Sequence, residues 1–427
     1  MPFSTTASRR FLPHATAALV GVAAIAATLL YLPQAGKRTA SGGPPASPAP
    51  SATPSADVPA LPAGVRLNII AGKDPSGVRQ ELIAEWNAEH PQAPAHLREI
   101  EGDTSRQRLE IRTALRDGSA AVAVLDSVHL SEFAARRDDG TDGLLAELGS
   151  DDALVDGFLK GPLATCYWKQ RRYGLPFNTD VGLLFTAGGT PEPDSWTEMT
   201  DSARASANRR QIALQLGPNE AFVVNVLEQM LAEDKSILNS TGVENVVRRD
   251  DWEAAIEPLK KAYAEGLILD SGSEDAGTEA LIDGRVRYLR NWPAQYKKID
   301  RRPEVRRLFG PGVLGGQNLV VSRTTPYDEQ ALELLKFLTN SRSQERLFRV
   351  GGFAPTRRTT YGLQAVRDDV PYAAELLTAV EAARPRPITP HYDKVSGLIL
   401  NNLRPAVLYG RRIDDSFELD MAEALHE

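Results

Sequence analysis

The chain has 427 residues, of which 25% are charged and 42% are hydrophobic, and its formal net charge is -7 at pH 7. This length suits two lobes plus a non-globular end better than one ordinary core. Because the body carries no long basic block, we expect no nucleic-acid partner, and the charge is compatible with a small neutral ligand.

The cysteine and histidine content excludes several kinds of site. Cys166 is the only cysteine, so this chain can form neither an intrachain disulfide nor a zinc site built from several thiolates. We expect Cys166 to be a small buried residue beside Tyr167 and Trp168. The six histidines are scattered, with no pair spaced four residues apart. We therefore predict no metal and no other cofactor.

Residues 1–35 have the pattern of a membrane-targeting segment. Two arginines precede a stretch, 11–36, that contains no Lys, Arg, Asp or Glu. At about 1.5 Å per residue this run is just long enough to cross about 30 Å of hydrocarbon. The positive residues before it favour a body outside the cytoplasm. A signal anchor and a cleaved signal peptide both stay open, and the anchor is preferred because Pro33 makes cleavage after Ala35 unfavourable.

The protein is therefore expected at the cell membrane with a single N-terminal anchor, or secreted if the segment is cleaved. Residues 36–64, which come next, are dominated by Pro, Ala, Ser and Gly. Such a composition buries too little apolar surface to fold, and its prolines favour extended segments. We predict a semi-rigid stalk.

The body begins with alternating strands and helices. Residues 65–71 have the β-branched alternation of a strand, and residues 78–90 have the apolar spacing of a helix. A second helix is predicted around 106–116, followed by a continuous apolar run at 121–126 that is typical of a buried parallel strand. This repeat predicts an open α/β sheet with helices on both faces.

Ligands of open α/β sheets bind beyond the carboxyl ends of the strands. The topology therefore places Lys73, Asp74, Asp126 and His129 at a cleft. Asp126 has a second explanation, because Asp at such a turn often caps the helix that follows. Both explanations stay open.

The middle of the chain continues the alternation. Residues 173–177 and 183–186 look like strands separated by Asn178-Thr179-Asp180, a triplet that is either a plain turn or part of a binding site. Residues 193–197 open a helix, with Ser195 or Asp194 as its cap. Two further helices are expected at 222–233 and 252–265, and a strand is expected just before Asn291-Trp292-Pro293.

The last third contains a glycine pair, a strand at 318–322, a helix that ends near Asn340 and a glycine-led loop at 351–357. Gly310, Gly312 and Gly315 spell GxGxxG, but they lead into a strand rather than a helix, so we expect a flexible connection between lobes instead of a dinucleotide site. No P-loop, GxSxG or HExxH motif occurs, and we expect no enzymatic activity.

Five segments of the body resemble one known family. They are the segment 314–358, a strand ending in Leu-Pro before Asn-Thr-Asp, the Pro-x-x-Trp-x-Glu element, the Asn-Trp-Pro triplet and Ala-Arg-Pro-Arg-Pro from Ala383. They are similar to the extracellular solute-binding proteins of carbohydrate ABC importers, which include the maltose- and trehalose-binding proteins. The resemblance extends from about residue 65 to the end.

The resemblance implies an α/β, two-lobed, periplasmic-binding-protein-like fold of type II. Each lobe would be an open, mostly parallel sheet flanked by helices, with the ligand cleft at the hinge. Lobe 1 would comprise 65–178 plus 313–340, and lobe 2 would comprise 179–309 plus 341–427.

The resemblance also adds site residues to those that the topology provides. In the family, the tryptophan at the place of Trp292 stacks on a sugar face, and an aromatic plate flanked by polar groups suits a pyranose. A core position for Trp292 is the alternative. The complete set of predicted ligand-binding residues is Lys73, Asp74, Asp126, His129, Asp180, Trp292, Gln317, Gly352 and Arg357.

The implied function is capture of a sugar or oligosaccharide between hinged lobes for the membrane permease of an ABC importer, by a monomer. Two departures keep a second function open, that of a membrane-anchored sensor or scaffold. The chain lacks the lipobox cysteine that usually tethers such proteins in Gram-positive bacteria. In addition, His129-Leu130 stands where many relatives carry a tryptophan.

Overall fold

The computed structural model describes residues 58–102, 104–136, 142–208, 210–233, 248–300 and 302–426. All of them belong to one unit, Ser55–Glu427. The expected anchor at 1–35 and most of the expected stalk lie outside the described residues. Of the helices that are described, none is long and apolar enough to cross a membrane.

The first sheet forms the core of lobe 1. Its strand order is β13-β12-β3-β1-β2, and β6 pairs with β12. The strands are β1 (Leu67–Gly72), β2 (Ala95–Ile100), β3 (Val122–Asp126), β6 (Gly174–Asp180), β12 (Val313–Val321) and β13 (Arg384–Pro385). β1 is parallel to β2 and β3, whereas β12 is antiparallel to β3 and β6. A short hairpin, β4 (Tyr167–Trp168) and β5 (Arg171–Arg172), lies apart from this sheet.

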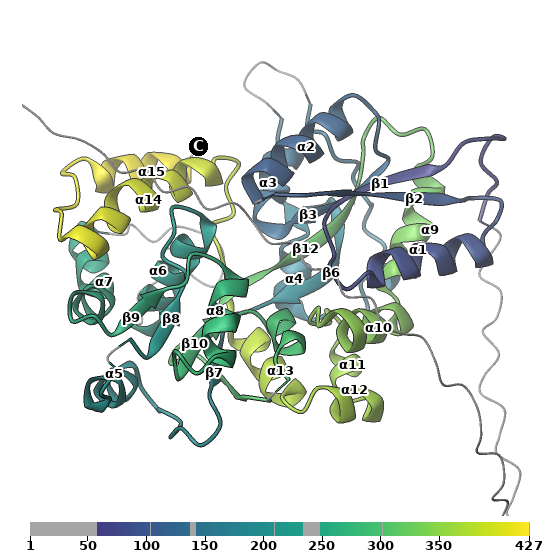
Figure 1. Cartoon of the computed structure of the whole chain (residues 1–427). Coiled ribbons are helices and arrows are strands. Elements are labelled where there is room, and N and C mark those ends of the chain that lie inside the picture. Colours follow the sequence, from purple (N-terminus) through teal and green to yellow (C-terminus); the bar gives the residue numbers. More distant parts are fainter. Residues whose placement is uncertain are drawn as a thin grey trace, which may run out of the picture. The chain divides into compact units, whose positions relative to one another are not determined.

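Helices cover both faces of this sheet (Figure 1). The helices α1 (Val78–Glu89) and α9 (Asp328–Thr339) pack on one face, where Leu82 and Leu334 join one apolar cluster. On the other face lie α2 (Thr104–Arg116) and α3 (Leu130–Ala134), whose Ile111 and Phe133 join a second cluster. The alternation of strand side chains divides the two clusters, as the sequence pattern predicts.

The second sheet forms the core of lobe 2, in the order β11-β7-β10-β8-β9. Its strands are β7 (Leu183–Thr186), β8 (Ile212–Leu214), β9 (Ile268–Asp270), β10 (Tyr288–Asn291) and β11 (Glu304–Arg307). The remaining helices are α4 (Lys160–Ala164), α5 (Trp196–Ala205), α6 (Glu220–Ala232), α7 (Arg249–Ala264), α8 (Glu274–Ile282), α10 (Ser341–Gly351), α11 (Arg358–Tyr361), α12 (Gln364–Asp369), α13 (Ala373–Ala382), α14 (Tyr392–Tyr409) and α15 (Phe417–His426).

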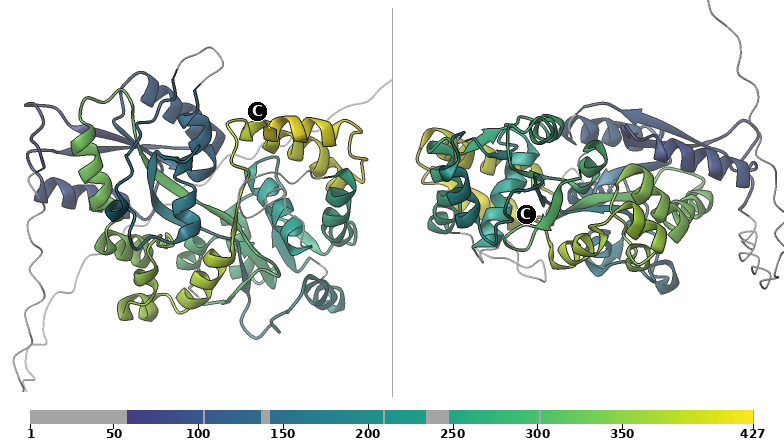
Figure 2. Two further views of the ribbon diagram at one scale, coloured as in Figure 1. Left: turned by 180° about the vertical axis from the view of Figure 1, so that it is seen from behind. Right: turned by 60° about the horizontal axis from the view of Figure 1, so that its bottom comes forward.

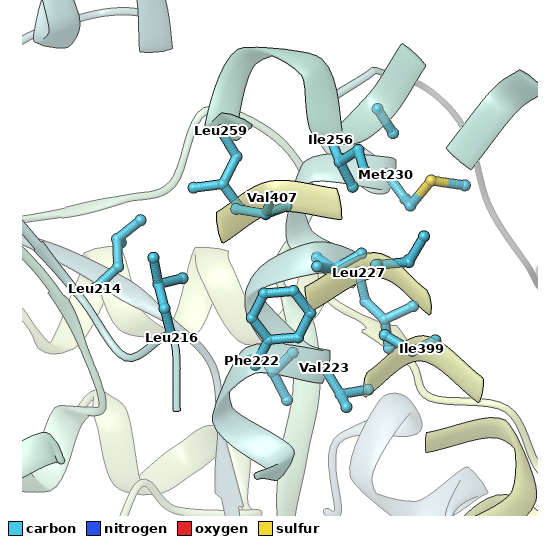
Figure 3. Packing of buried hydrophobic residues seen from close by; sticks show 14 of the residues in the cluster. Leu214, Leu216, Phe222, Val223, Leu227, Met230, Ile256, Leu259, Ile399 and Val407 are labelled. Atoms are coloured by element: carbon cyan, nitrogen blue, oxygen red, sulfur yellow. The ribbon is translucent and has the colours of Figure 1, made fainter. Parts of the chain in front are cut away.

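The largest apolar cluster of lobe 2 is built around α6. Figure 3 shows Phe222 and Leu227 of α6 in one cluster with Leu259 of α7 and Val407 of α14, and all four are buried. The carboxyl-terminal helices α14 and α15, drawn in yellow, lie over α6 and α7 in both views (Figures 1 and 2). Burial of each such side chain contributes about 1.5–3 kcal/mol, so this segment is an integral part of lobe 2.

Both sheets are mixed, which refines the expected mostly parallel arrangement. In lobe 2, β8 is parallel to β9 and β10, but β7 is antiparallel to β10 and β11. In lobe 1, the antiparallel strands β6 and β12 are the ones that lead out of and back into the sheet. The antiparallel pairs in lobe 1 therefore arise where the chain crosses between the lobes.

The triplet Asn178-Thr179-Asp180 is not a turn, because β6 runs through it and pairs with β12 as far as Gly315. The pairing depends on Gly316, which has φ 117°. A Cβ atom there would lie 2.3 Å from the carbonyl oxygen of Asn178. Only glycine fits this close crossing of two strands.

The end of the expected stalk also belongs to lobe 1. Val58 and Leu61 are buried in the same cluster as α1, and the Leu61 amide donates to the Gln92 carbonyl at 2.9 Å. Burial of these two side chains contributes about 1.5–3 kcal/mol each, which offsets part of the conformational entropy lost when the segment is ordered. The ordered body thus begins before residue 64, where the composition alone placed the boundary.

Candidate ligand-binding cleft

A cavity of about 610 Å³ lies where the strands of both lobes end. Its volume falls within the roughly 300–1,000 Å³ usual for small-molecule sites. Of the nine residues predicted from the sequence, the six that line the cavity are Lys73, Asp126, Asp180, Trp292, Gln317 and Gly352. Gly315 and Gly316, which precede Gln317 in β12, line it as well. The structure thus brings together residues that are up to 279 positions apart in the sequence, from Lys73 to Gly352.

On the lobe 1 side, the polar groups are already occupied. Lys73 Nζ lies 2.6 Å from Glu101 Oε1, and both side chains are exposed. Gln317 Oε1 accepts a hydrogen bond from Arg79 Nη2 at 2.5 Å. Lys73 and Gln317 in this wall are therefore already paired with other side chains of the protein.

Arg79 itself was missed by the sequence analysis. It is 4% exposed, donates to the Gly72 carbonyl at 3.2 Å, and lies over the Phe353 ring with 4.6 Å between guanidinium carbon and ring centre. Burial lowers the pKa of Arg79 to about 10, and the charge of Asp74 partly opposes that shift. Its position in the first turn of α1 looks like that of any surface arginine, so the sequence held no signal for it.

Asp126 has two structural partners. Its Oδ1 accepts from the Val128 amide at 3.2 Å, which confirms the capping role, and from Arg386 Nη2 at 2.7 Å. Arg386 also donates through Nη1 to Glu220 Oε1 at 3.0 Å. Because Asp126 ends β3 and Glu220 begins α6, Arg386 joins lobe 1 to lobe 2.

Arg386 is held firmly in its charged form. Burial lowers the pKa of its guanidinium, but the charge of Asp126, followed by Tyr392 and Glu220, outweighs burial and raises it. Glu220 gains further support from the Tyr392 hydroxyl and from Ser396 Oγ, which donates to Oε2 at 3.0 Å. Neither Arg386 nor Glu220 was predicted as a site residue.

The lobe 2 side differs, because it contains carboxylates with raised pKa values. Burial raises the pKa of Asp180 to about 8, the charge of Glu274 adds to the rise, and Arg290 opposes it. Burial also raises the pKa of Glu274, against Arg290 and a hydrogen bond from Trp292. Asp180 ends β6 and Glu274 begins α8, so the hinge strand and a lobe 2 helix bring the two acids to the same cavity.

Trp292 combines the two roles considered from the sequence. It is half-buried and packs against the main apolar cluster of lobe 2, yet it also lines the cavity. The guanidinium carbon of Arg290 lies 3.9 Å from its ring centre. Arg290 in turn makes two hydrogen bonds to Glu228, at 2.8 Å from Nε and 2.5 Å from Nη2. Arg290, itself held by Glu228, thus keeps the Trp292 ring in position at the border of the cleft.

Two neutral side chains also line the cavity, Asn178 from the hinge strand β6 and Gln215 from the segment after β8 of lobe 2. Asn178 and Gln215 are 6% and 1% exposed, both line the cavity, and their side-chain oxygens have no hydrogen-bond partner within the described structure. Gln215 Nε2 donates to the Arg290 carbonyl at 3.3 Å, which directs its oxygen. A buried polar atom without a partner is unusual in proteins and suggests that a ligand supplies one.

Three predicted residues are not in the cavity lining. Asp74 is 5% exposed and accepts from the amides of Ser76 and Arg79, so it shapes the start of α1. His129 is 8% exposed, and its Nδ1 lies 3.4 Å from Glu132 Oε2.

The third, Arg357, donates to the carbonyls of Thr339 and Asp156 at 2.7 and 2.8 Å and covers the Phe158 ring. In all three cases the polar groups are directed toward protein partners rather than into the cavity. Strand-end topology predicts the right region of the molecule but not the direction of each side chain.

A larger hollow of about 1,120 Å³ lies on lobe 1, beside α2 and the β4–β5 hairpin. Its arginines pair with neighbouring acids, among them Arg108 with Glu132 and Arg323 with Asp142. Several of the charged groups that line it are thus paired within the protein, although Arg112 Nε has no hydrogen-bond partner among the described residues. The smaller cavity between the lobes is therefore the better candidate for a ligand site.

The sequence matches the model of a protein family described as bacterial extracellular solute-binding protein, over residues 81–374. The chain belongs to this family of solute-binding proteins. A relative in the family, an uncharacterized lipoprotein in the oleD 5' region of Streptomyces antibioticus, is 26% identical over 349 residues, covering 73% of this chain and 74% of the relative. A probable ABC transporter-binding protein of Deinococcus radiodurans is 26% identical over 256 residues, and the match covers 52% of this chain and 61% of that protein.

Solved structures of other solute-binding proteins share the fold. Maltose-bound MalE3 of T. maritima has a TM-score of 0.74 and 21% identity, covering 84% of this chain and 98% of that one. The GacH receptor of Streptomyces glaucescens, solved without ligand and with acarbose, has a TM-score of 0.70 and 18% identity, covering 84% and 97%. The two-lobed α/β fold expected for this solute-binding protein is thus confirmed.

Proposed function

We propose that this solute-binding protein captures a sugar or oligosaccharide in the cleft between its lobes and delivers it to the permease of an ABC importer. The observation that carries the proposal is the aromatic plate of Trp292 beside Asp180, Asn178 and Gln215 in one cavity. Pyranose rings combine apolar C–H faces with a polar rim, and this combination of side chains suits both.

The comparisons support the same ligand class. MalE3 of T. maritima was solved with maltose and the GacH receptor with acarbose, and the relative in Deinococcus radiodurans is named a probable ABC transporter-binding protein. A micromolar sugar would contribute about 8 kcal/mol at standard state. That exceeds the roughly 5.5 kcal/mol of differential binding that shifts a two-state hinge almost completely.

The test is isothermal titration of the full-length protein against maltose, trehalose, malto-oligosaccharides and other disaccharides. The protein should be purified in a detergent without a sugar head group, because a maltoside would compete for the cleft. We expect at least one sugar to bind with micromolar affinity, and Trp292→Ala to weaken it at least tenfold. Absence of heat throughout the panel would refute the sugar-binding function.

We further propose that the two lobes have the boundaries inferred from the sequence, 65–178 plus 313–340 and 179–309 plus 341–427, except that β13 (Arg384–Pro385) pairs with β12 in the lobe 1 sheet. Residues 58–64 are added to lobe 1 because Val58 and Leu61 are buried there. The working form is proposed to be a monomer that performs no catalysis.

The apolar segment near the amino terminus is proposed as the membrane tether. The Streptomyces antibioticus relative is named a lipoprotein, but the one cysteine of this sequence, Cys166, is buried in the body, where burial raises its thiol pKa. Membrane fractionation of the full-length protein tests this proposal, since a tethered protein stays in the membrane pellet at high salt.

The sensor or scaffold function remains the second candidate because Cys166 provides no lipid tether of the usual kind. Deletion of the gene separates the two functions. Loss of uptake of the identified sugar supports transport, whereas normal uptake with an altered response to that sugar supports sensing.

A further inference from the structure

The lobe 2 wall of the cleft contains more carboxyl groups than the protein itself pairs with cations. Three carboxylates, those of Asp180, Glu274 and Glu228, lie around the single guanidinium of Arg290. Arg290 and Glu228 form a two-bond ion pair whose side chains are 3% and 6% exposed. Arg290 also opposes the raised pKa values of Asp180 and Glu274, and its Nη1 has no hydrogen-bond partner among the described residues. One guanidinium still cannot pair with three carboxyl groups, so Asp180 and Glu274 are left without an ion-pair partner of their own.

The other cations near this wall are committed elsewhere. Lys298 Nζ lies 2.5 Å from Asp275 Oδ1, and on the opposite side of the cleft Lys73 pairs with Glu101. Among the described residues, Arg290 and Lys298 are the cations that act on Glu274, yet burial still raises its pKa. The Glu274 side chain is exposed, so it is open to a ligand, and the amino end of α8 favours its negative charge.

An independent observation also points to a ligand that donates hydrogen bonds. Asn178 Oδ1 and Gln215 Oε1 are buried acceptors without a partner, on side chains that are 6% and 1% exposed and that line the same cavity. With Asp180 and Glu274, the wall offers two amide oxygens and two carboxylates. A ligand that suits it must supply donors, and a cationic donor would also balance the charge.

We propose that the sugar bound in this cleft carries a protonated amine, and that Asp180 and Glu274 hold its ammonium group while Asn178 and Gln215 accept from neighbouring donors. The inference rests on the proposed carbohydrate-binding function and narrows it to amino sugars. The half-buried ring of Trp292 borders the same cavity and provides the apolar surface for the sugar ring.

Binding of the ammonium group would release a proton. In the empty cleft at pH 7, Asp180 is mostly protonated, because burial raises its pKa to about 8. An ammonium ion favours the ionised carboxylate, so the carboxyl proton leaves to solvent as the ion pair forms. Affinity should therefore increase with pH until the amine itself loses its proton, near pH 8 for an amine of about that pKa. A neutral sugar does not require this ionisation.

The experiment compares matched sugars by isothermal titration with the full-length protein. One set contains the glucosamine disaccharide from chitosan, its N-acetylated form and cellobiose, and a second set contains trehalosamine and trehalose. In at least one set we expect the amine to bind at pH 7 about tenfold more tightly than its neutral counterparts, with a Kd that falls by more than tenfold between pH 5.5 and pH 7.5. The measured heat should depend on the ionisation enthalpy of the buffer, in the sense of proton release.

The outcomes separate this inference from the function on which it rests. If neutral sugars bind as tightly as the matched amines, the amino-sugar inference is overturned while carbohydrate binding stands. If neither amines nor neutral sugars bind, both proposals fail.

Two isosteric substitutions test the residues. Asp180→Asn and Glu274→Gln should each weaken amine binding by about tenfold to a hundredfold, and should weaken binding of the matched neutral sugar less, so that the preference for the amine is reduced or lost. Glu279→Gln, an exposed acid on the same helix α8, is the matched control and should leave the preference intact. Survival of the amine preference in both cleft variants, with melting curves showing that they are folded, would overturn the assignment.

Discussion

Two buried arginines border the cleft, and they differ in what they connect. Arg290 of β10 pairs with Glu228 of α6, so both partners belong to lobe 2. Arg386, which follows β13, pairs with Asp126 of lobe 1 and Glu220 of lobe 2. The chemistry is the same in both places, but one arginine organises a lobe and the other joins two lobes. A hinge motion leaves the first pair intact, whereas separation of the lobes at this place requires the second to break.

The largest expected effect is on stability and comes from Arg290. Replacement by methionine leaves the carboxylate of Glu228 buried at 6% exposure without its partner. Loss of one member of such a pair costs about 3–5 kcal/mol, and urea unfolding at pH 7 measures it. The double variant Arg290→Met with Glu228→Gln should recover most of this loss, since it removes the orphaned charge. A single variant as stable as the double would show that the pair is not a buried ion pair in solution.

Arg386→Met should cost less, about 2 kcal/mol, because Asp126 and Glu220 are 19% and 21% exposed and can be partly hydrated. Tyr392 and Ser396 also continue to donate to Glu220. The distinctive result should appear in shape, as a larger radius of gyration in small-angle X-ray scattering of the ligand-free protein. Arg290→Met, measured under conditions in which it is folded, serves as the control, and its radius of gyration should equal that of the wild type. An unchanged radius in Arg386→Met would contradict the role of Arg386 as a link between lobes.

The two arginines also show how far sequence reasoning reaches. The helices at 78–90 and 328–339 follow from apolar spacing, and the fold follows from motifs such as Asn-Trp-Pro. Arg386 lies in the Ala-Arg-Pro-Arg-Pro element, but its partners Glu220 and Asp126 are 166 and 260 residues away. Which side chain meets which across such separations depends on how the lobes are packed, and a local pattern carries no information about it.

The same limit explains the cleft. Lys73, Asp126 and Asp180 were placed there by strand ends and family motifs, and they line the cavity. Glu274 was not predicted, because an acid in the first turn of a helix is ordinary and only its place near Asp180 and Arg290 in the folded protein makes it unusual. The extension of β6 through Asp180 was missed for a related reason, since the strand exists by pairing with β12, which comes more than a hundred residues later.

A third prediction concerns Asp180, the carboxyl group near Arg290 that has no ion-pair partner of its own. The folded-state pKa of Asp180 is raised from 3.8 to about 8, so its contribution to stability is complete below about pH 4 and is lost as pH rises through 8. Asp180→Asn cannot ionise and should be more stable than the wild type at pH 9, with little difference at pH 4. Thermal melts across this range measure the effect.

Asp275→Asn is the matched control with the opposite sign. The hydrogen bond from Lys298 lowers the pKa of Asp275, so its ionised form favours folding above its unfolded pKa. This variant should be less stable than the wild type at neutral pH and should lose that deficit as pH falls below 4. Parallel pH profiles for wild type and Asp180→Asn would contradict the raised pKa of Asp180.

The smallest effect on stability is expected for the ion pair between Lys73 and Glu101. The two atoms are only 2.6 Å apart, as close as in the buried pairs, but their side chains are 56% and 74% exposed. Water competes for both charges and salt screens them, so Lys73→Met should leave the free energy of unfolding unchanged within error. If Lys73 contacts the ligand, the same variant should weaken sugar affinity in titrations while its unfolding curve overlays that of the wild type. A marked loss of stability would mean that the short distance between the two charges matters more than their exposure to water. The comparison of Arg290 with Arg386 argues against that result, because the more exposed pair is expected to contribute less.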